Sequence, residues 1–405
     1  MLFIILAIII FDFALDRYLD YLNSKTWSNA LPDALRDLYD ADKYSKAQQY
    51  DKANNQFSTI SDTFSTVLTI ILLLTGLFGI YNDWIVSKTD NLLYQCFLFF
   101  GIMAVANDII TLPFSLYHTF VIEEKFGFNK TTVKTFFIDK LKGYLLGGII
   151  GGCLLAMFIW FYQFTGALFW LYAWIVFSLF TLLMTMFYSS VILPLFNKLT
   201  PLPDGELRTA IEAYCRKVDF KLNNLFVMDG SKRSAKANAF FSGIGRKKRI
   251  VLFDTLIEQH TTEELVAVLA HEIGHYKKKH TQQSFIISVL QTGFTLFIFS
   301  LFVNNPDISK AFGSEQHTIM LGLLGFGILY APISMILGLL MNMLSRKNEY
   351  EADHYAKTTY AAQPLAEALK KLSVHHLSNL QPHPLYVFFH YSHPTLLQRL
   401  KAMGV

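Results

Sequence analysis

The sequence predicts a mainly α-helical, multi-pass membrane protein with one polar domain that contains a small β-hairpin. Of its 405 residues, 53% are hydrophobic and only 16% are charged, whereas soluble domains carry roughly 25% charged residues. The mean hydropathy is +0.34. Seven apolar segments approach the ~20 residues that a helix needs to cross a bilayer. The largest polar block, 196–283, separates the fifth segment from the sixth, so we expect a polar domain beside seven helices in a lipid bilayer.

The seven predicted spans follow the apolar segments in chain order. They cover 1–21, 64–83, 92–112, 143–163, 168–193, 284–303 and 318–344. The first has a short apolar run interrupted by Asp12 and Asp16, so a cleaved signal peptide is the alternative interpretation. Because no basic start and no small-residue cleavage site precede these acids, we favour an uncleaved span.

A set of regularly spaced glycines and a pair of polar residues fall inside the spans. Gly143, Gly147 and Gly151 recur every four residues, a spacing that favours close packing against another helix. Asn107 and Asp108 lie late in the third span. Ionisable groups in a span face a cavity or serve a function, unless they lie near the membrane surface. The sequence leaves the role of this pair open.

The distribution of Lys and Arg predicts the orientation in the membrane. The connections after spans one, three and five and the C-terminal tail are rich in basic residues, whereas the connections after spans two, four and six carry one or none. Since cytoplasmic loops carry the excess positive charge, the N-terminus is expected outside and the C-terminus in the cytoplasm. The net charge of +4 is small and gives no reason to expect a nucleic-acid partner.

Four regions follow from this arrangement. Residues 1–195 hold spans one to five, 196–283 form a cytoplasmic domain, 284–345 hold spans six and seven, and 346–405 form a C-terminal segment. The motifs described next predict that 196–283 and 346–405 are catalytic. Within the polar block, the apolar periodicity predicts a helix over 206–218 and a strand over 225–228. The runs 238–241 and 250–253 predict a hairpin with a glycine-rich basic turn at 243–249. A further helix is expected to open at Thr262, with Thr as its cap.

The most informative motif is His271-Glu272-Ile273-Gly274-His275, which lies in that last helix. Residues four apart lie on one face of a helix, so His271 and His275 can reach one metal ion. Glu272 can then reach a water molecule beside that ion. This is the HExxH arrangement of zinc hydrolases. A catalytic zinc needs a third protein ligand, and no His lies at the offset that metzincins use.

A glutamate on a later helix would complete a gluzincin-type set of two histidines and one glutamate. The segment 346–353 supplies Glu349 and Asp353, which are four apart and hence on one helical face. Glu349 can ligate the metal while Asp353 accepts a hydrogen bond from a ligand imidazole. Glu351 should point elsewhere, towards the surface. Without the HExxH motif, an ordinary exposed charged helix would be the better interpretation of this segment.

HExxH followed downstream by Glu-x-x-x-Asp resembles the integral-membrane zinc metalloendopeptidases of the type I CAAX prenyl protease family. Four further stretches are similar to that family: 120–132 (FVIEEKFGFNKTT), 229–238 (DGSKRSAKAN), 250–256 (IVLFDTL) and 390–400 (HYSHPTLLQRL). The resemblance runs from about the third span to the C-terminus. The first two spans match in hydropathy only.

This resemblance implies a fold, a cofactor and a set of roles. It implies seven helices enclosing an intramembrane chamber, and a peptide or protein substrate that ends in a CAAX sequence and could be prenylated. It also implies one Zn²⁺ per chain, with Glu272 as general base and His393 as donor to the oxyanion. The metal ligands would be His271, His275 and Glu349, supported by Asp353 and Arg399. An edge strand with Asn238, Ala239 and Phe240 would pair with the substrate backbone.

Some features depart from the family pattern. The segment 234–237 lacks a His often seen there, so the substrate could be contacted differently. The loop 304–317 is short compared with eukaryotic members, and residues 401–405 carry no retrieval signal of the dilysine or KDEL type. The last two points favour a bacterial inner membrane; a eukaryotic member would be expected in the endoplasmic reticulum membrane.

Two other functions remain open from the sequence. The same chemistry could serve quality control of membrane proteins without dependence on a prenyl group. A seven-helix transporter or receptor with an incidental HExxH is the alternative from another class, which stoichiometric zinc in the purified protein would exclude.

Overall fold

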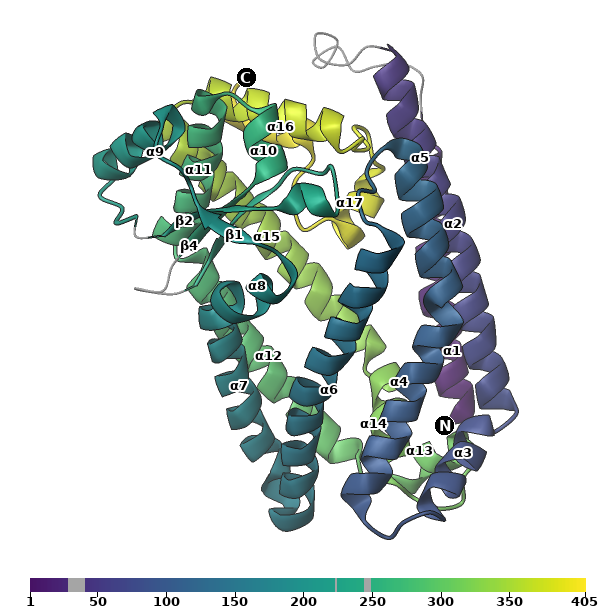
Figure 1. Cartoon of the computed structure of the whole chain (residues 1–405). Coiled ribbons are helices and arrows are strands. Elements are labelled where there is room, and N and C mark those ends of the chain that lie inside the picture. Colours follow the sequence, from purple (N-terminus) through teal and green to yellow (C-terminus); the bar gives the residue numbers. More distant parts are fainter. Residues whose placement is uncertain (28–40, 223, 244–248) are drawn as a thin grey trace.

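The computed structural model describes residues 1–27, 41–222, 224–243 and 249–405. Long helices run along the molecule and alone make up one of its ends, and a small sheet with the C-terminal helices lies at the other end (Figure 1). The turn 244–248 of the predicted hairpin lies outside the described residues.

The helices outside the polar domain come from both halves of the chain. In order they are α1 (Leu2–Ser24), α2 (Ala41–Leu74), α3 (Leu77–Val86), α4 (Leu92–Tyr117), η2 (His118–Glu123), α5 (Glu124–Phe126), α6 (Val133–Phe164), η3 (Gly166–Leu168), α7 (Phe169–Phe187), η4 (Tyr188–Ile192), α8 (Leu193–Phe196), α12 (His280–Phe302), α13 (Pro306–Ala311), α14 (Ile319–Leu329) and α15 (Ala331–Thr359).

The predicted count of seven spans is not confirmed. Among the described residues, five helical stretches are long and apolar enough to cross a membrane, and they are Asp42–Leu74, Leu92–Phe126, Val133–Phe164, Gly166–Phe196 and His280–Phe302. The pair α14 and α15, bent by 49°, would make a sixth if it is one span. Helix α1 has 23 residues but is rich in charge along its second half. Arg17 of α1 pairs there with Asp62 of α2 at 2.8 Å.

The second predicted span has the wrong boundaries. The apolar stretch 64–83 is divided between α2, which ends at Leu74, and the short helix α3. Gly76 separates them with a φ of +67°, a left-handed conformation that glycine adopts without strain. The hydropathy of the stretch continues across this break, so hydropathy alone could not locate it.

Few residues of the candidate membrane spans are buried inside the molecule. Only 6–17% of the most apolar stretch of each candidate span is buried inside the molecule. The predicted packing of the α6 glycines is wrong, because a Cβ atom at Gly143, Gly147 or Gly151 would meet nothing in the described part of the chain within 4 Å. Polar contacts instead connect α4 with α6, where Asp108 accepts from Lys140 at 2.6 Å and also from Tyr144.

The polar domain is built on a four-stranded sheet with order β1-β2-β4-β3. Its strands are β1 (Leu199–Pro201), β2 (Leu225–Met228), β3 (Ala239–Ser242) and β4 (Arg249–Phe253). The antiparallel pair β3–β4 and the predicted strand 225–228 are confirmed. The parallel pairing of β2 with β4 and the edge strand β1 were not predicted. Its helices are α9 (Glu206–Lys217), η5 (Gly230–Lys232), α10 (Asp254–Gln259), α11 (Thr262–Lys277), α16 (Ala362–His375), α17 (Pro384–His390) and α18 (Leu396–Met403).

Helix α11 runs through the centre of this domain. Its apolar residues from Leu265 to Ile273 are buried, so the helix that carries HExxH is held by neighbours on several sides. The helix is capped by Thr261, one residue before the expected Thr262. The Thr261 side chain accepts from the Glu264 N–H, and the Glu264 carboxylate accepts from the Thr261 N–H. This capping box fixes where the helix begins.

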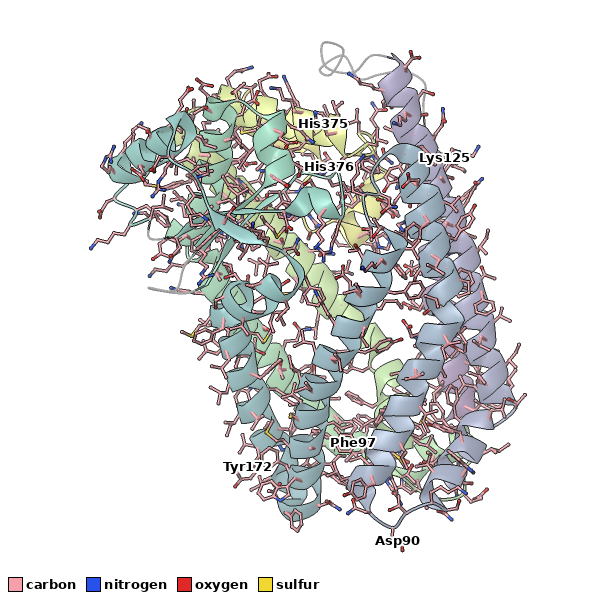
Figure 2. The ribbon with its side chains drawn as sticks, viewed as in Figure 1. Asp90, Phe97, Lys125, Tyr172, His375 and His376 are labelled. Carbon is pink, nitrogen blue, oxygen red and sulfur yellow. The ribbon has the colours of Figure 1, made fainter. Side chains whose placement is uncertain are left out.

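Ion pairs connect the polar domain to the helices that precede it in the chain. Arg233 makes a bidentate pair with Asp139 of α6 at 2.7 and 3.0 Å. Lys236 lies 3.1 Å from Glu123 and donates to Tyr50 of α2 at 2.9 Å. Because Lys236 lies three residues before β3, this contact fixes the start of the strand relative to the helices. Figure 2 shows Lys125 and His376 at the end with the polar domain, and Asp90 at the opposite end.

Candidate metal centre and active site

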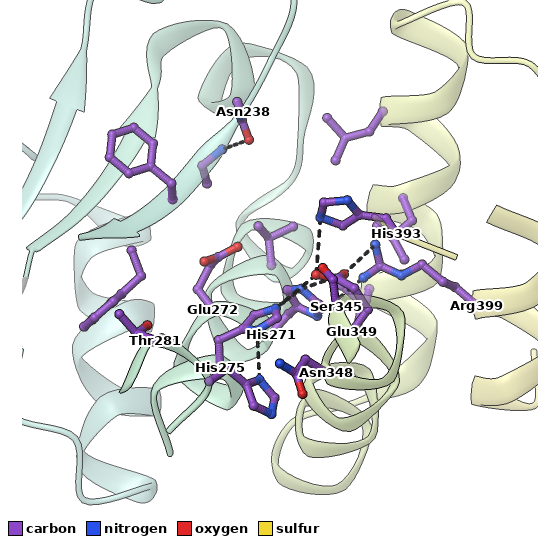
Figure 3. Close-up of a pocket in the computed structure, with 18 of the residues that line it drawn as sticks. Asn238, His271, Glu272, His275, Thr281, Ser345, Asn348, Glu349, His393 and Arg399 are labelled. Atoms are coloured by element: carbon purple, nitrogen blue, oxygen red, sulfur yellow. Dashed lines mark hydrogen bonds and ion pairs between the residues drawn. The ribbon is translucent and has the colours of Figure 1, made fainter. Parts of the chain in front are cut away.

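Helices α11 and α15 bring three predicted ligand side chains together. The Nε2 atoms of His271 and His275 are 3.1 Å apart. The carboxylate of Glu349 lies 3.5 Å from the first of these atoms and 3.3 Å from the second. The ligand atoms of these three residues all lie within 4.8 Å of one another. Figure 3 shows them converging from the two helices at one point of a pocket.

Gly274 allows the two helices to approach this closely. A Cβ atom at this position would lie 3.1 Å from the Cα and carbonyl oxygen of Ala352 and 3.2 Å from the Cβ of Tyr355. Both neighbours belong to α15, and Ala352 is fully buried. The glycine inside HExxH therefore determines how near Glu349 comes to the two histidines.

The chemistry of the three side chains fits a divalent metal ion. The Nδ1 atom of His271 faces Asp353 at 2.9 Å, so it carries the proton and Nε2 offers a lone pair. The buried Oε2 atom of Glu349 has no hydrogen-bond donor among the described residues. Glu349 also raises the pKa of His275 above its ordinary value, although burial lowers it. The carboxylate of Glu349 favours a positive charge beside it. Zinc commonly binds such a set of two imidazoles and one carboxylate.

Asp353 and Arg399 surround these side chains with a buried network. Arg399 of α18 donates to both Asp353 oxygens, at 2.8 and 2.6 Å, and lies 3.4 Å from Glu349. Carboxylate hydrogen bonds raise the pKa of the Arg399 guanidinium against the effect of burial. The guanidinium thus balances two buried carboxylates, and Asp353 orients His271.

Glu272 lies beside the three side chains without joining them. Its carboxylate faces the same pocket (Figure 3) and accepts a backbone hydrogen bond from Phe241 of β3. Burial raises the pKa of the Glu272 carboxyl, and the nearby His271 and His275 oppose that rise. The side chain is therefore placed where it can exchange a proton with a molecule held in the pocket.

The pocket is a cavity of about 620 Å³ that extends along strand β3. The predicted residues Asn238, Ala239 and Phe240 line it, together with Phe241. Strand β3 lies at the edge of the sheet. The Phe253 N–H donates to the Asn238 carbonyl on the β4 side. Since the backbone groups of an antiparallel strand alternate in direction, those of Ala239 and Phe241 face the pocket.

His393 lies at the opening of the cavity. Its Nε2 atom is 3.3 Å from Glu349, and its side chain is 62% exposed. It follows α17 in the turn before Pro394 and reaches the pocket from the side opposite β3 (Figure 3). The imidazole can therefore donate a hydrogen bond to a molecule that enters between β3 and α15.

Two further residues near the centre, His280 and Glu351, were not predicted from the sequence to lie there. His280, at the start of α12, has its Nδ1 atom 3.0 Å from Nδ1 of His275. Glu351, expected at the surface and pointing away, lies 3.3 Å from the Nε2 atom of His280. No helical periodicity could have found this contact, because it depends on a break between α11 and α12.

Comparisons with known proteins agree over nearly the whole chain. Residues 20–198 match the family described as CAAX prenyl protease N-terminal, five membrane helices, and residues 201–404 match peptidase family M48. The Probable CAAX prenyl protease 1 of Schizosaccharomyces pombe is 37% identical, covering 92% of this chain and 81% of that protein. The CAAX prenyl protease 1 of Saccharomyces cerevisiae is 35% identical, covering 97% and 92%.

The solved structures include a close match to the fold. The crystal structure of S. mikatae Ste24p has a TM-score of 0.94 and 35% identity, and the match covers 100% of this chain and 99% of that one. Sequence and fold therefore agree over the same residues. This chain is a member of peptidase family M48 and carries the N-terminal domain of the CAAX prenyl proteases.

Proposed function

We propose that this peptidase is a zinc-dependent endopeptidase that hydrolyses peptide bonds near the C-terminus of CAAX-type substrates. One observation carries the proposal: His271, His275 and Glu349 converge beside Glu272 and an open strand edge in a single cavity. The relatives named above are called CAAX prenyl proteases, which supports this class of substrate. Dependence on a prenyl group is the finer part of the proposal.

His271, His275 and Glu349 would hold one zinc ion. The orphaned Oε2 atom of Glu349 and the lone pair of His271 support this assignment. When bound, zinc would polarise the scissile carbonyl and lower the pKa of a water molecule towards neutrality. Asp353 would keep His271 in the tautomer that leaves Nε2 free, and Arg399 would hold Asp353 in place.

Glu272 would act as general base and then as general acid. It would take a proton from the attacking water and deliver it to the nitrogen of the leaving amine. Its position supports this role, because the carboxylate faces the pocket beside the three proposed ligands without joining them. His393 would donate to the oxyanion that forms on the scissile carbonyl, a contribution of roughly 3–4 kcal/mol for one donor.

The substrate backbone would add to the sheet at β3. The inward-facing carbonyl groups of Ala239 and Phe241 support pairing with an extended peptide, while their N–H groups donate to the Asn238 side chain and to Glu272. Asn238 and Phe240 flank Ala239 in the strand. This arrangement would place the scissile bond over Glu272, because Phe241 already donates to that carboxylate.

The polar domain would lie on the cytoplasmic side, with the N-terminus outside. The positive charge of the predicted cytoplasmic connections supports this orientation. The low burial of the membrane helices and the open glycine face of α6 support a hollow chamber between them. The named relatives are eukaryotic and give no support to a bacterial inner membrane, so the endoplasmic reticulum membrane is the location we propose.

Cleavage of a matched peptide pair tests the proposal. One peptide is farnesylated on the Cys of a C-terminal CAAX sequence and the other is unmodified. We expect faster cleavage of the farnesylated peptide, and none of either peptide after chelation of the metal. Equal cleavage of both would contradict prenyl dependence and favour general membrane-protein proteolysis. Cleavage that survives complete metal removal would contradict the zinc mechanism itself.

A further inference from the structure

His275 has a buried imidazole behind it, on the side away from Glu349. The Nδ1 atom of His280 lies 3.0 Å from Nδ1 of His275, and His280 is only 5% exposed. The other nitrogen of His280 lies 3.3 Å from a Glu351 carboxylate oxygen. The three side chains come from α11, α12 and α15 and form a line that leads away from the proposed metal position.

The chain must break its helix to make this contact. At 3.6 residues per turn, positions five apart lie about 140° apart around a helix, so His280 could not face His275 on a continuous α11. Lys279 adopts a φ of +62° between the two helices, a conformation that is uncommon outside glycine. This single residue turns the chain so that His280 points back towards His275.

The position of each proton on His275 and His280 follows from the groups at the two ends of this line, the proposed metal and the Glu351 carboxylate. If His275 offers the Nε2 lone pair to a metal, its Nδ1 atom carries the proton and donates to Nδ1 of His280. His280 then carries its own proton on Nε2 and donates it to Glu351, which can only accept. Every nitrogen in the line therefore has one consistent role, and the tautomer of each imidazole is determined.

The two ligand histidines are supported in different ways. His271 contacts the buried carboxylate of Asp353 directly. His275 reaches a carboxylate only through a second imidazole, and Glu351 is 38% exposed. Partners of this kind orient a ligand histidine and raise its basicity, and their loss typically lowers metal affinity roughly 10- to 100-fold.

We propose that His280 and Glu351 are positioning residues that hold His275 in the tautomer and orientation needed to bind the metal. This inference rests on the proposed zinc site. His280 carries most of the effect, because it is buried and contacts the ligand. Glu351 acts through His280, so its loss has a smaller effect and adds little once His280 has been replaced.

The test measures metal affinity by competition with a chelator, using full-length protein in detergent. We expect His280→Ala to bind zinc roughly 10- to 100-fold more weakly. In the cobalt-substituted protein, the same variant should change the visible absorption spectrum. His280→Asn should restore most of the affinity, because the Asn oxygen can occupy the position of Nδ1 and accept from His275. Glu351→Ala should lie between His280→Ala and the unmodified protein.

Matched controls separate positioning from general damage. His354→Ala removes an exposed histidine of α15, and Lys347→Ala removes the exposed partner of Glu351; both should leave metal affinity unchanged. Thermal unfolding of the metal-free variants reports loss of fold. Unchanged zinc affinity in His280→Ala would overturn the inference. A loss of zinc affinity that His280→Asn does not restore would also overturn it, and so would a loss that is explained by unfolding of the metal-free variant. If the unmodified protein binds no zinc, the proposed function fails, and this inference fails with it.

Discussion

At the scale of single residues, the centre combines two imidazoles with buried carboxylates and a buried guanidinium. Asp353 and Arg399 neutralise each other and together orient His271. Glu349 retains an oxygen to which no described residue donates. Glu272 stands apart from this network. We therefore expect its replacement to affect the chemistry but not the binding of metal.

Replacing Glu272 by Gln tests that separation. The amide has nearly the same shape but cannot accept the proton of the attacking water, so we expect cleavage to fall roughly 100- to 10,000-fold. Zinc content should remain equal to that of the unmodified protein. Peptide cleavage and elemental analysis on the same preparation measure both. Full activity in Glu272→Gln would contradict the mechanism.

Arg399 should matter for stability as well as for the site. Replacement by Met leaves the buried carboxylates of Asp353 and Glu349 without their guanidinium, and breaking a buried pair in this way costs roughly 3–5 kcal/mol. We expect a lower thermal unfolding temperature and weaker zinc binding. Lys401→Met, on the exposed face of the same helix, is the control. An unfolding temperature equal to that of this control would show that Arg399 does not balance the carboxylates.

At the scale of elements, the distance between α11 and α15 determines whether a metal site forms. Gly274→Ala places a methyl group too close to Ala352 and Tyr355, at 3.1 to 3.2 Å from their nearest atoms. Overpacking of this kind costs roughly 1–3 kcal/mol, and α15 must move away from the histidines. We expect weaker zinc binding and lower thermal stability.

Gly338→Ala provides the comparison for that prediction. Gly338 also lies in a helix, α15, but a Cβ atom there would meet nothing within 4 Å in the part of the chain that the structure describes. The Gly338→Ala substitution should leave zinc affinity unchanged. If Gly274→Ala binds zinc as tightly as Gly338→Ala, then the approach of the helices does not control the site.

A neutral histidine accepts a hydrogen bond at the start of β3, so we expect the stability of the folded protein to depend on pH. His376 of the polar domain accepts a hydrogen bond from the Ala237 N–H at 3.1 Å. Burial, helped by the nearby Lys236, lowers the pKa of His376 to about 4, against ~6.5 in an unfolded chain. The folded state therefore favours the neutral form. The contribution of neutral His376 to the stability of the folded state is complete above pH ~6.5 and is lost as the pH falls towards 4.

Thermal unfolding of unmodified protein and His376→Gln between pH 7 and pH 4.5 measures this contribution. The Gln oxygen can accept from Ala237 without titrating, so the variant should lose less stability on acidification. His354→Gln, at an exposed position of α15, should behave like the unmodified protein. Identical pH profiles for all three proteins would contradict the assignment.

At the scale of the whole molecule, the sequence predicts local features better than the packing of distant ones. The helix with HExxH, the strand 225–228 and the β3–β4 pair are determined by short patterns, and all three are present. The partner segment with Glu349 was predictable because a pair of histidines needs a third ligand to hold a catalytic zinc.

Other features depend on contacts that no local pattern reveals. The parallel pairing of β2 with β4 joins two strands that are separated by β3 in the chain. The break at Gly76 lies inside a continuous apolar stretch. His280 reaches His275 only because Lys279 adopts a left-handed conformation. The open face of α6 shows the same limit, since its glycine spacing is equally compatible with packing and with open space.

We infer that this chain is built around one zinc site. Elemental analysis of the purified full-length protein tests it most directly, with Glu349→Ala as the comparison. We predict close to one zinc per unmodified chain and a large loss in the variant while its helical circular dichroism is retained. A folded, proteolytically active protein without stoichiometric metal, or a Glu349→Ala variant that retains its zinc, would contradict the claim.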